Sequence, residues 1–339
     1  WDIFTIVTNQ ISPGVPVAFD ITHGLRSFPL IGLLVSAFLR SSNRVDLHAV
    51  LYGAFDVRDQ TVMPNRTPMF DLTPMLDLLE WASAADRFTR TGDARYLASL
   101  GKREQKALAA AAGKDRDQMA QVGALGNLAG ALSGISQALG LIRPNQSMES
   151  IAGLAQRIEA AKPALAKAAP AQPLFMLLEQ IGETYAGLGL NDPTNPAVVT
   201  DNLSTQVKMI GWYIEREQWI QAVTLLREWF VSWTMVQLNQ TDILDSEARH
   251  SVETVLNSES KAWQKSKQLN LAFSPTFLSA LPVIEQILDL WGQVTQTRND
   301  INHAGMRPNP GQPEKLIEKV KDYHVQIQNL PLPTSAQPG

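Results

Sequence analysis

The stretch V-P-V-A-F-D, Val15 to Asp20, decides the fold expected for the first part of this 339-residue sequence. It is short, apolar and β-branched, which is typical of a strand covered on both faces. Ser27 can cap a following helix, with Pro29 in its first turn. The run V-D-L-H-A-V-L-Y-G-A-F, Val45 to Phe55, predicts a second strand. Strand, helix and strand in this order form the unit of a parallel sheet, so we expect an α/β domain here.

The regions flanking this unit refine the expectation. Residues 1–11 predict an amphipathic helix that lacks the basic region and cleavage site of a signal peptide, and we therefore expect the sequence to begin inside a domain. The segment D-I-T-H-G-L-R, Asp20 to Arg26, follows the first expected strand, and ligands of parallel sheets bind beyond such strand ends. The expected buried face of the helix between the strands consists of Ile31, Leu34, Val35 and Phe38.

From Pro74 onward helical periodicity recurs and strand patterns are absent, which predicts an all-α second domain. T-G-D at Thr91 to Asp93 interrupts the pattern. We therefore predict an α/β domain over residues 1–93, a helical domain over 94–332 and a flexible tail over 333–339.

Three segments of the helical part allow further expectations. Gln118 to Ile142 contains no charged residue, but its glycines and polar residues favour a small-residue helix packed inside the protein or at a subunit interface over a membrane span. The three prolines between Ala160 and Pro173 predict a helix break or linker. A stripe at helical spacing is expected to pack in the core rather than to stack nucleobases: Trp219, Val223, Leu226, Phe230 and Trp233.

Composition limits the classes of function. The net charge of −4 argues against a protein that binds nucleic acid over its whole surface, so any RNA contact must be local. The absence of cysteine excludes disulfides, thiolate metal sites and a cysteine nucleophile, and it fits a reducing compartment such as the cytoplasm. No H-E-x-x-H or other metal-binding motif is present. Of the scattered histidines, we expect His48 to pack in its strand and His250 and His324 to face solvent.

The sharpest candidate for chemistry lies near the end of the long helix expected after residue 280. An apolar stripe runs through Ile287, Trp291 and Val294, and its next step of four residues falls on Arg298. A buried arginine needs a carboxylate, a partner subunit or an anionic ligand such as phosphate. His303 follows five residues later, roughly 140° around an ideal helix. The two side chains could converge if the helix end unwinds or if a two-fold partner helix takes part.

R-N-D-I-N-H, Arg298 to His303, has the R-x-x-x-x-H spacing of HEPN ribonucleases. Three upstream segments, in the same order, are similar to the CRISPR-associated CARF-HEPN family: D-I-T-H-G-L-R-S-F-P-L (20–30), L-Y-G-A-F (51–55) and F-D-L-T-P-M-L-D-L-L-E-W (70–81). The sequence therefore resembles that family, densely over residues 1–95 and again over 291–307.

This resemblance implies the C-terminal half of a Rossmann-like CARF domain followed by an all-α HEPN domain. It implies a homodimer that binds a cyclic oligoadenylate, with cyclic tetra-adenylate as the expected form, as an allosteric activator. The implied activity is metal-independent cleavage of single-stranded RNA in type III CRISPR antiviral defence, with no other cofactor and no membrane partner. The family's first strand and phosphate-facing loop have no counterpart here, so the resemblance implies only half of an activator pocket.

Matching positions carry the implied roles. Arg298 would stabilise the charge of the transition state, His303 would act as acid and base, and Asn299 and Asn302 would orient the phosphate or the attacking 2′-hydroxyl. The surviving half of the activator pocket would be lined by Asp20, Thr22, His23, Gly24 and Arg26. An ordinary strand-to-helix turn would share these features. Two other functions stay open, a non-catalytic nucleotide sensor and an ungated, toxin-like HEPN ribonuclease.

Overall fold

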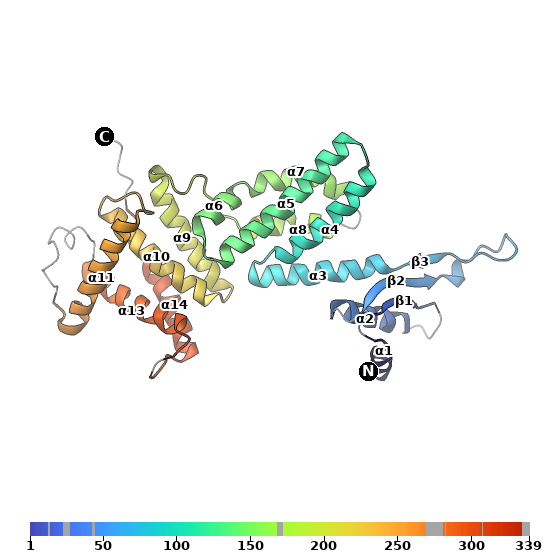
Figure 1. Ribbon diagram of the computed structural model, residues 1–339, viewed down its shortest axis with the longest axis horizontal. Coiled ribbons are helices and arrows are strands. Elements are labelled where there is room, and N and C mark those ends of the chain that lie inside the picture. Colours follow the sequence, from blue (N-terminus) through green and yellow to red (C-terminus); the bar gives the residue numbers. More distant parts are fainter. Residues whose placement is uncertain are drawn as a thin grey trace.

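The computed structural model describes residues 1–12, 14–22, 28–42, 45–167, 172–268, 281, 283–306 and 308–333. Helices dominate these residues, and a small three-stranded sheet lies near the N-terminus (Figure 1). The observed architecture therefore agrees with the expected order of a strand-containing part followed by a helical part.

The sheet has the order β1 (Pro16–Asp20), β2 (Asp46–Gly53) and β3 (Met69–Asp71). β1 and β2 are parallel, and the helix α2 (Phe28–Ser41) lies between them in the chain, as predicted. β3 is antiparallel to β2 and was not predicted, because three residues are too few to show an alternating pattern. Helix α1 (Asp2–Gln10) precedes the sheet and contacts α2.

Burial around the sheet differs from the expectation in two respects. β1 is not covered on both faces, since exposed and half-buried side chains alternate along it. In α2, Val35 is buried as predicted and Ile31 is partly buried against the same cluster, but Leu34 and Phe38 are 55% and 47% exposed. Leu39, which was not predicted, is buried instead. The helix is apolar on nearly every side, so periodicity alone could not identify the face that packs.

Helix α3 (Thr73–Thr91) belongs to two hydrophobic clusters. Its first turn contributes Leu76 to a cluster with Ile21 and Val50 of the sheet region. Its later turns contribute Trp81 and Phe88 to the large core of the helical part. Figure 1 shows α3 lying between the sheet and the other helices, so one continuous helix connects the two regions.

The rest of the described chain is helical. The elements are α4 (Arg95–Ala112), α5 (Arg116–Gly140), α6 (Pro144–Ala152), α7 (Leu154–Lys167), α8 (Gln172–Thr184), α9 (Val199–Glu215), α10 (Trp219–Gln237), α11 (Ser246–Ser266), α13 (Ile284–Asn302) and α14 (Pro313–Gln328), with short 3-10 turns η1 (Phe55–Val57) and η3 (Pro196–Val198). Four members of the α10 stripe, from Val223 to Trp233, are fully buried, and Trp219 packs against the core. The prediction that this stripe packs is therefore confirmed.

The two remaining segment predictions have mixed outcomes. In α5, an added Cβ at Gly126 would contact the Gln105 side chain at 2.3 Å, so this glycine allows close packing, whereas Gly130 and Gly134 face open space. Within the described ranges, every helix falls short of the length and apolar character that a membrane span needs. The predicted break between Ala160 and Pro173 is confirmed, since α7 ends at Lys167 and α8 begins at Gln172, but Pro163 itself lies inside α7, contrary to the expectation that it forbids a helix interior. Pro163 is exposed, so water can satisfy the carbonyl group that its missing N–H leaves free.

His324 is half-buried rather than solvent-facing, and His48 is exposed rather than packed, whereas His250 is exposed as predicted. A ring nitrogen of His324, Nε2, lies 3.1 Å from the carbonyl oxygen of Val207. Burial lowers the pKa of His324 below its ordinary value of 6.5. The unfolded chain therefore takes up this proton at a higher pH than the folded protein does.

We expect this histidine to make the protein less stable in mild acid. As the pH falls through 6.5 towards the lower pKa of the folded state, the unfolded state binds more protons and the free energy of unfolding decreases. Urea unfolding of wild type and His324→Gln, at a pH above and a pH below 6.5, measures this contribution. His250→Gln, at an exposed histidine, serves as the control. If the free energy of unfolding of His324→Gln depended on pH as strongly as that of wild type, the contribution assigned to His324 would be contradicted.

Candidate functional site

The C-terminal end of α13 holds the residues expected to carry chemistry. Ile287, Trp291 and Val294 are buried in the core, as their spacing predicted, and Arg298 continues the same face half-buried. The apolar stripe anchors the helix, so the guanidinium group is presented where the stripe reaches the molecular surface.

Arg298 has no carboxylate partner among the described residues, although a half-buried guanidinium group normally has one. Its Nη1 donates a hydrogen bond to Oδ1 of Asn299 at 3.2 Å. Its Nε is buried and has no hydrogen-bond partner, and among the described residues Arg298 forms no ion pair. A cation in this position can therefore interact with an incoming anion without first breaking an internal salt bridge.

His303 is exposed at the C-terminal cap of α13. Its backbone N–H still donates to the carbonyl oxygen of Asn299 at 2.9 Å, so the helix does not unwind before this residue. The first of the two routes to convergence is therefore not observed. Positions 299 and 303 share one side of the helix, and positions 298 and 302 share another.

A tight turn follows helix α13, and a hydrogen bond to the Asp300 side chain links this turn to the helix. The helix ends at Asn302, and beyond its cap residue His303 the positive φ angles of Ala304 and Gly305, 53° and 66°, turn the chain. Asp300 is 3% exposed, and its Oδ2 accepts a hydrogen bond from the backbone N–H of Gly311 at 2.7 Å. A Cβ at Gly311 would lie 2.7 Å from the same oxygen, so this close approach favours glycine. The motif thus contains a buried carboxylate that holds the turn after His303 in place.

Replacing Asp300 with alanine is expected to loosen this turn and to reduce the free energy of unfolding by about 1–3 kcal/mol, because a buried hydrogen bond to a charged group is lost. Urea unfolding measures the stability, and amide hydrogen exchange at Gly311 measures the local effect. Glu285→Ala removes an exposed carboxylate from the first turn of the same helix and is the control. Equal exchange at Gly311 in both variants would contradict the role of Asp300.

The second candidate site lies where β1 ends. Oδ1 of Asp20 accepts a hydrogen bond from the backbone N–H of Thr22 at 2.9 Å. Oγ1 of Thr22 accepts one from the backbone N–H of Gly53, at the end of the neighbouring parallel strand, at 2.8 Å. The structure therefore brings Asp20 and Thr22 to the carboxyl edge of the sheet, as predicted. His23, Gly24 and Arg26 lie outside the described residues.

Sequence reasoning missed two residues that shape these sites. Gly53 joins the ends of β1 and β2 through Thr22, and Asp300 joins the helix end to the turn after it. Helical phase gave no signal for Asp300, because its position lies roughly 120° or more around an ideal helix from Ile287, Trp291 and Val294. In the parts of the chain that the structure describes, no three His, Asp or Glu side chains gather as a metal site requires.

Comparisons with known proteins give a restricted match. No family model matches the sequence. The chain is 30% identical over 109 residues to the CRISPR-associated protein MJ1674 of Methanocaldococcus jannaschii. This similarity covers 32% of the chain and 17% of that protein, so the chain matches only a small part of its relative.

Proposed function

We propose that this chain is a CRISPR-associated endoribonuclease that cleaves single-stranded RNA without a metal ion and is gated by a cyclic oligoadenylate. The observation that carries the proposal is the half-buried Arg298, without an ion-pair partner among the described residues, five residues before the exposed His303. The partial similarity to a CRISPR-associated protein and the resemblance to CARF-HEPN ribonucleases support the biological setting.

The two residue types suit cleavage by the RNA itself. The 2′-hydroxyl oxygen attacks the adjacent phosphorus, the bond from phosphorus to the 5′-oxygen breaks, and a cyclic phosphate and a 5′-hydroxyl are formed. His303 takes the proton from the attacking hydroxyl or supplies one to the leaving oxygen. Arg298 stabilises the negative charge that develops on the phosphate oxygens, and Asn299 and Asn302 orient the reacting groups.

We further propose that the catalytic site is composite, with groups from two copies of the chain. Within one straight helix, positions 298 and 303 point roughly 140° apart, and α13 stays helical up to His303. A two-fold partner helix would place the arginine of one chain near the histidine of the other. A homodimer is therefore part of the proposed function.

Gating requires a physical link between the sheet and the helical part, and α3 provides one. Arg40 of α2 contacts Asp77 at 2.6 Å and Glu80 at 2.9 Å, both on α3. Arg103 of α4 contacts the same Glu80 at 2.6 Å. We propose that the activator binds beyond the carboxyl ends of β1 and β2, near Thr22, and favours one arrangement of α3 and hence of the dimer.

Cleavage of a single-stranded RNA, assayed with and without cyclic tetra-adenylate in the presence of EDTA, tests this function. We expect cleavage that the nucleotide stimulates and that the chelator leaves unchanged. Loss of cleavage in EDTA would contradict the metal-independent mechanism. Cleavage that ignores the nucleotide would indicate an ungated ribonuclease, and nucleotide binding without any cleavage would indicate a sensor.

A further inference from the structure

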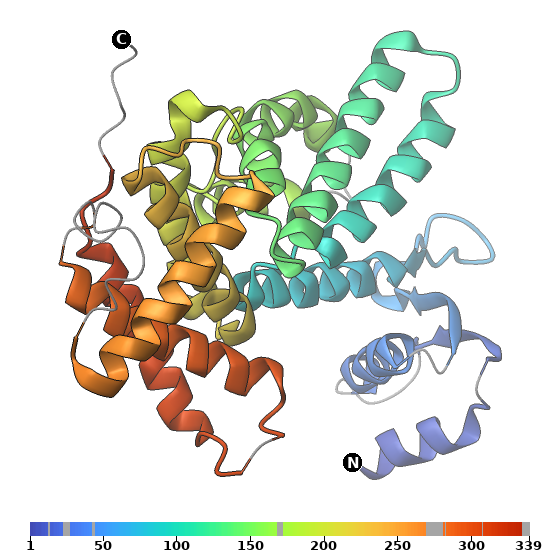
Figure 2. The same cartoon turned by 60° about the vertical axis from the view of Figure 1, so that its left-hand side comes forward.

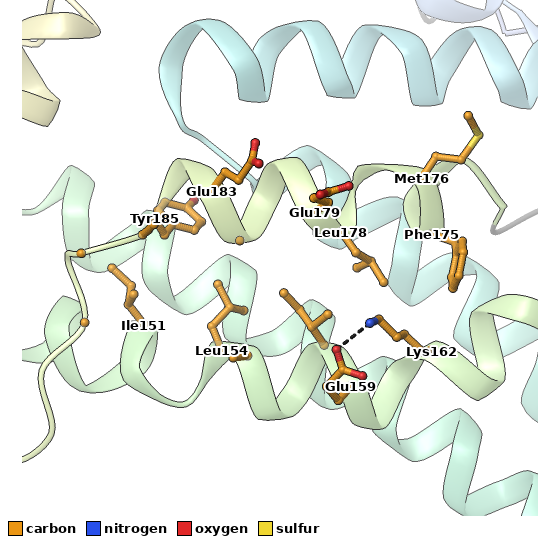
Figure 3. Close-up of a pocket in the computed structure, with 16 residues that line it drawn as sticks. Ile151, Leu154, Glu159, Lys162, Phe175, Met176, Leu178, Glu179, Glu183 and Tyr185 are labelled. Atoms are coloured by element: carbon orange, nitrogen blue, oxygen red, sulfur yellow. Dashed lines mark hydrogen bonds and ion pairs between the residues drawn. The ribbon is translucent and has the colours of Figure 1, made fainter.

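Helices α7 and α8 lie in the helical part, away from α13, which Figure 1 labels and Figure 2 shows from a second side. A groove lies between these two antiparallel helices (Figure 3). Its cavity volume is about 910 Å³. Figure 3 shows Leu154 of α7 and Leu178 of α8 pointing into the space between the helices, with Phe175 beside them. The floor is buried and almost wholly apolar: Ile151, Leu154, Ile158, Leu178 and Tyr185.

Small residues keep this groove open. Ala155 lines it on α7, and Gly182 and Ala186 line it on the opposite side. A Cβ added at Gly182 would meet no atom within 4 Å, so the space above this glycine is unfilled. Met176, which also lines the groove, is 79% exposed and can adjust to a bound surface.

The rim of the groove carries unbalanced negative charge. Nζ of Lys162 lies 2.5 Å from Oε1 of Glu159, so these two charges compensate each other. Glu179 and Glu183 also line the groove, and neither side chain has a hydrogen bond or ion pair among the described residues. They lie four residues apart, on the same side of α8. Glu183 stands in the last turn of α8, where the helix dipole disfavours an anion.

We propose that this groove binds a basic amphipathic helix of a partner protein. The lining positions on α7 extend from Leu154 to Lys162, about 12 Å at 1.5 Å per residue, which is the length of about two helical turns. Both walls are helices, so an extended peptide would find no strand edge to pair with. A helix satisfies its own backbone, buries an apolar stripe on the floor and places two cations opposite Glu179 and Glu183.

A designed peptide tests this inference without reference to RNA cleavage. The probe is a short, fluorescein-labelled helical peptide with a leucine stripe and two lysines four residues apart, and its partner probe has glutamates in place of the lysines. Fluorescence anisotropy with the full chain should show at least about tenfold tighter binding of the lysine peptide than of the glutamate peptide. The lysines form exposed ion pairs with Glu179 and Glu183, whereas glutamates at the same positions are repelled by them. Equal binding of both peptides, or binding of neither, would overturn the proposal.

Matched variants locate the binding. Gly182→Leu fills the groove and should weaken binding of the lysine peptide by more than about tenfold. Gly182→Ala raises helix propensity without filling the groove and should leave the binding unchanged. Glu179→Gln with Glu183→Gln should weaken binding about fivefold, and Glu314→Gln with Glu318→Gln, an exposed pair at the same spacing on α14, should not. Sedimentation tests the competing occupant. If a second copy of the chain fills the groove, Gly182→Leu will dissociate the oligomer, and the proposal fails.

Discussion

Replacing His303 or Arg298 with alanine is expected to reduce RNA cleavage by about 10²–10⁴-fold, because each change removes either proton transfer or stabilisation of the phosphate charge. Stability should change little for His303→Ala, since the side chain is exposed. Single-turnover cleavage of a labelled RNA measures the effect. His250→Ala and Arg116→Ala, both exposed on other helices, are the matched controls and should keep full activity.

The composite nature of the site gives a sharper test of the same prediction. If the productive pair comes from two chains, heterodimers of Arg298→Ala and His303→Ala still contain one intact arginine–histidine pair. Mixing the two inactive variants should therefore restore cleavage, provided that subunits exchange. Failure to restore cleavage, with exchange shown by mass spectrometry, would contradict a site shared between chains.

The sequence predicted α13 well because its physical signals are local. The spacing of Ile287, Trp291 and Val294 identifies both the helix and its buried face, and the same spacing places Arg298 at the edge of the core. The two parallel strands were predictable for a similar reason. Each is a short apolar run bounded by turn residues, and the helix between them determines their parallel direction.

Other features depend on contacts between residues that are distant in the sequence. The bond between Asp300 and Gly311 appears only when the chain turns back on the helix, and nothing local marks a carboxylate as a buried acceptor. The face of α2 could not be chosen because the sheet, rather than the helix pattern, decides whether Leu34 or Leu39 is buried. Pro163 was misread because exposure to water reduces the cost of a proline within a helix.

The largest expected effect on stability comes from Gly92, where α3 ends. The residue has a φ angle of 67°, and an added Cβ would lie 2.2 Å from Cζ2 of the buried Trp212. Trp212 cannot move away easily, because its Nε1 donates to the carbonyl oxygen of Thr184 at 3.0 Å and Arg216 stacks on its ring. Gly92→Ala should therefore reduce the free energy of unfolding by about 2–5 kcal/mol, as backbone strain and overpacking add.

The clash can be separated from the backbone strain. Gly187 also has a positive φ angle, 75°, but a Cβ there would meet only the flexible Lys208 side chain at 3.9 Å. Gly187→Ala should therefore lose only the backbone component, about 1–2 kcal/mol, in urea unfolding. Replacing Trp212 with leucine in the Gly92→Ala variant removes the ring that the added Cβ would meet. This second change should restore part of the free energy of unfolding that the clash costs, and a double-mutant cycle measures that part. Equal stability of the two glycine variants would mean that the end of α3 is not held against Trp212, and the helix proposed to couple the sheet to the helical part would lose its fixed anchor.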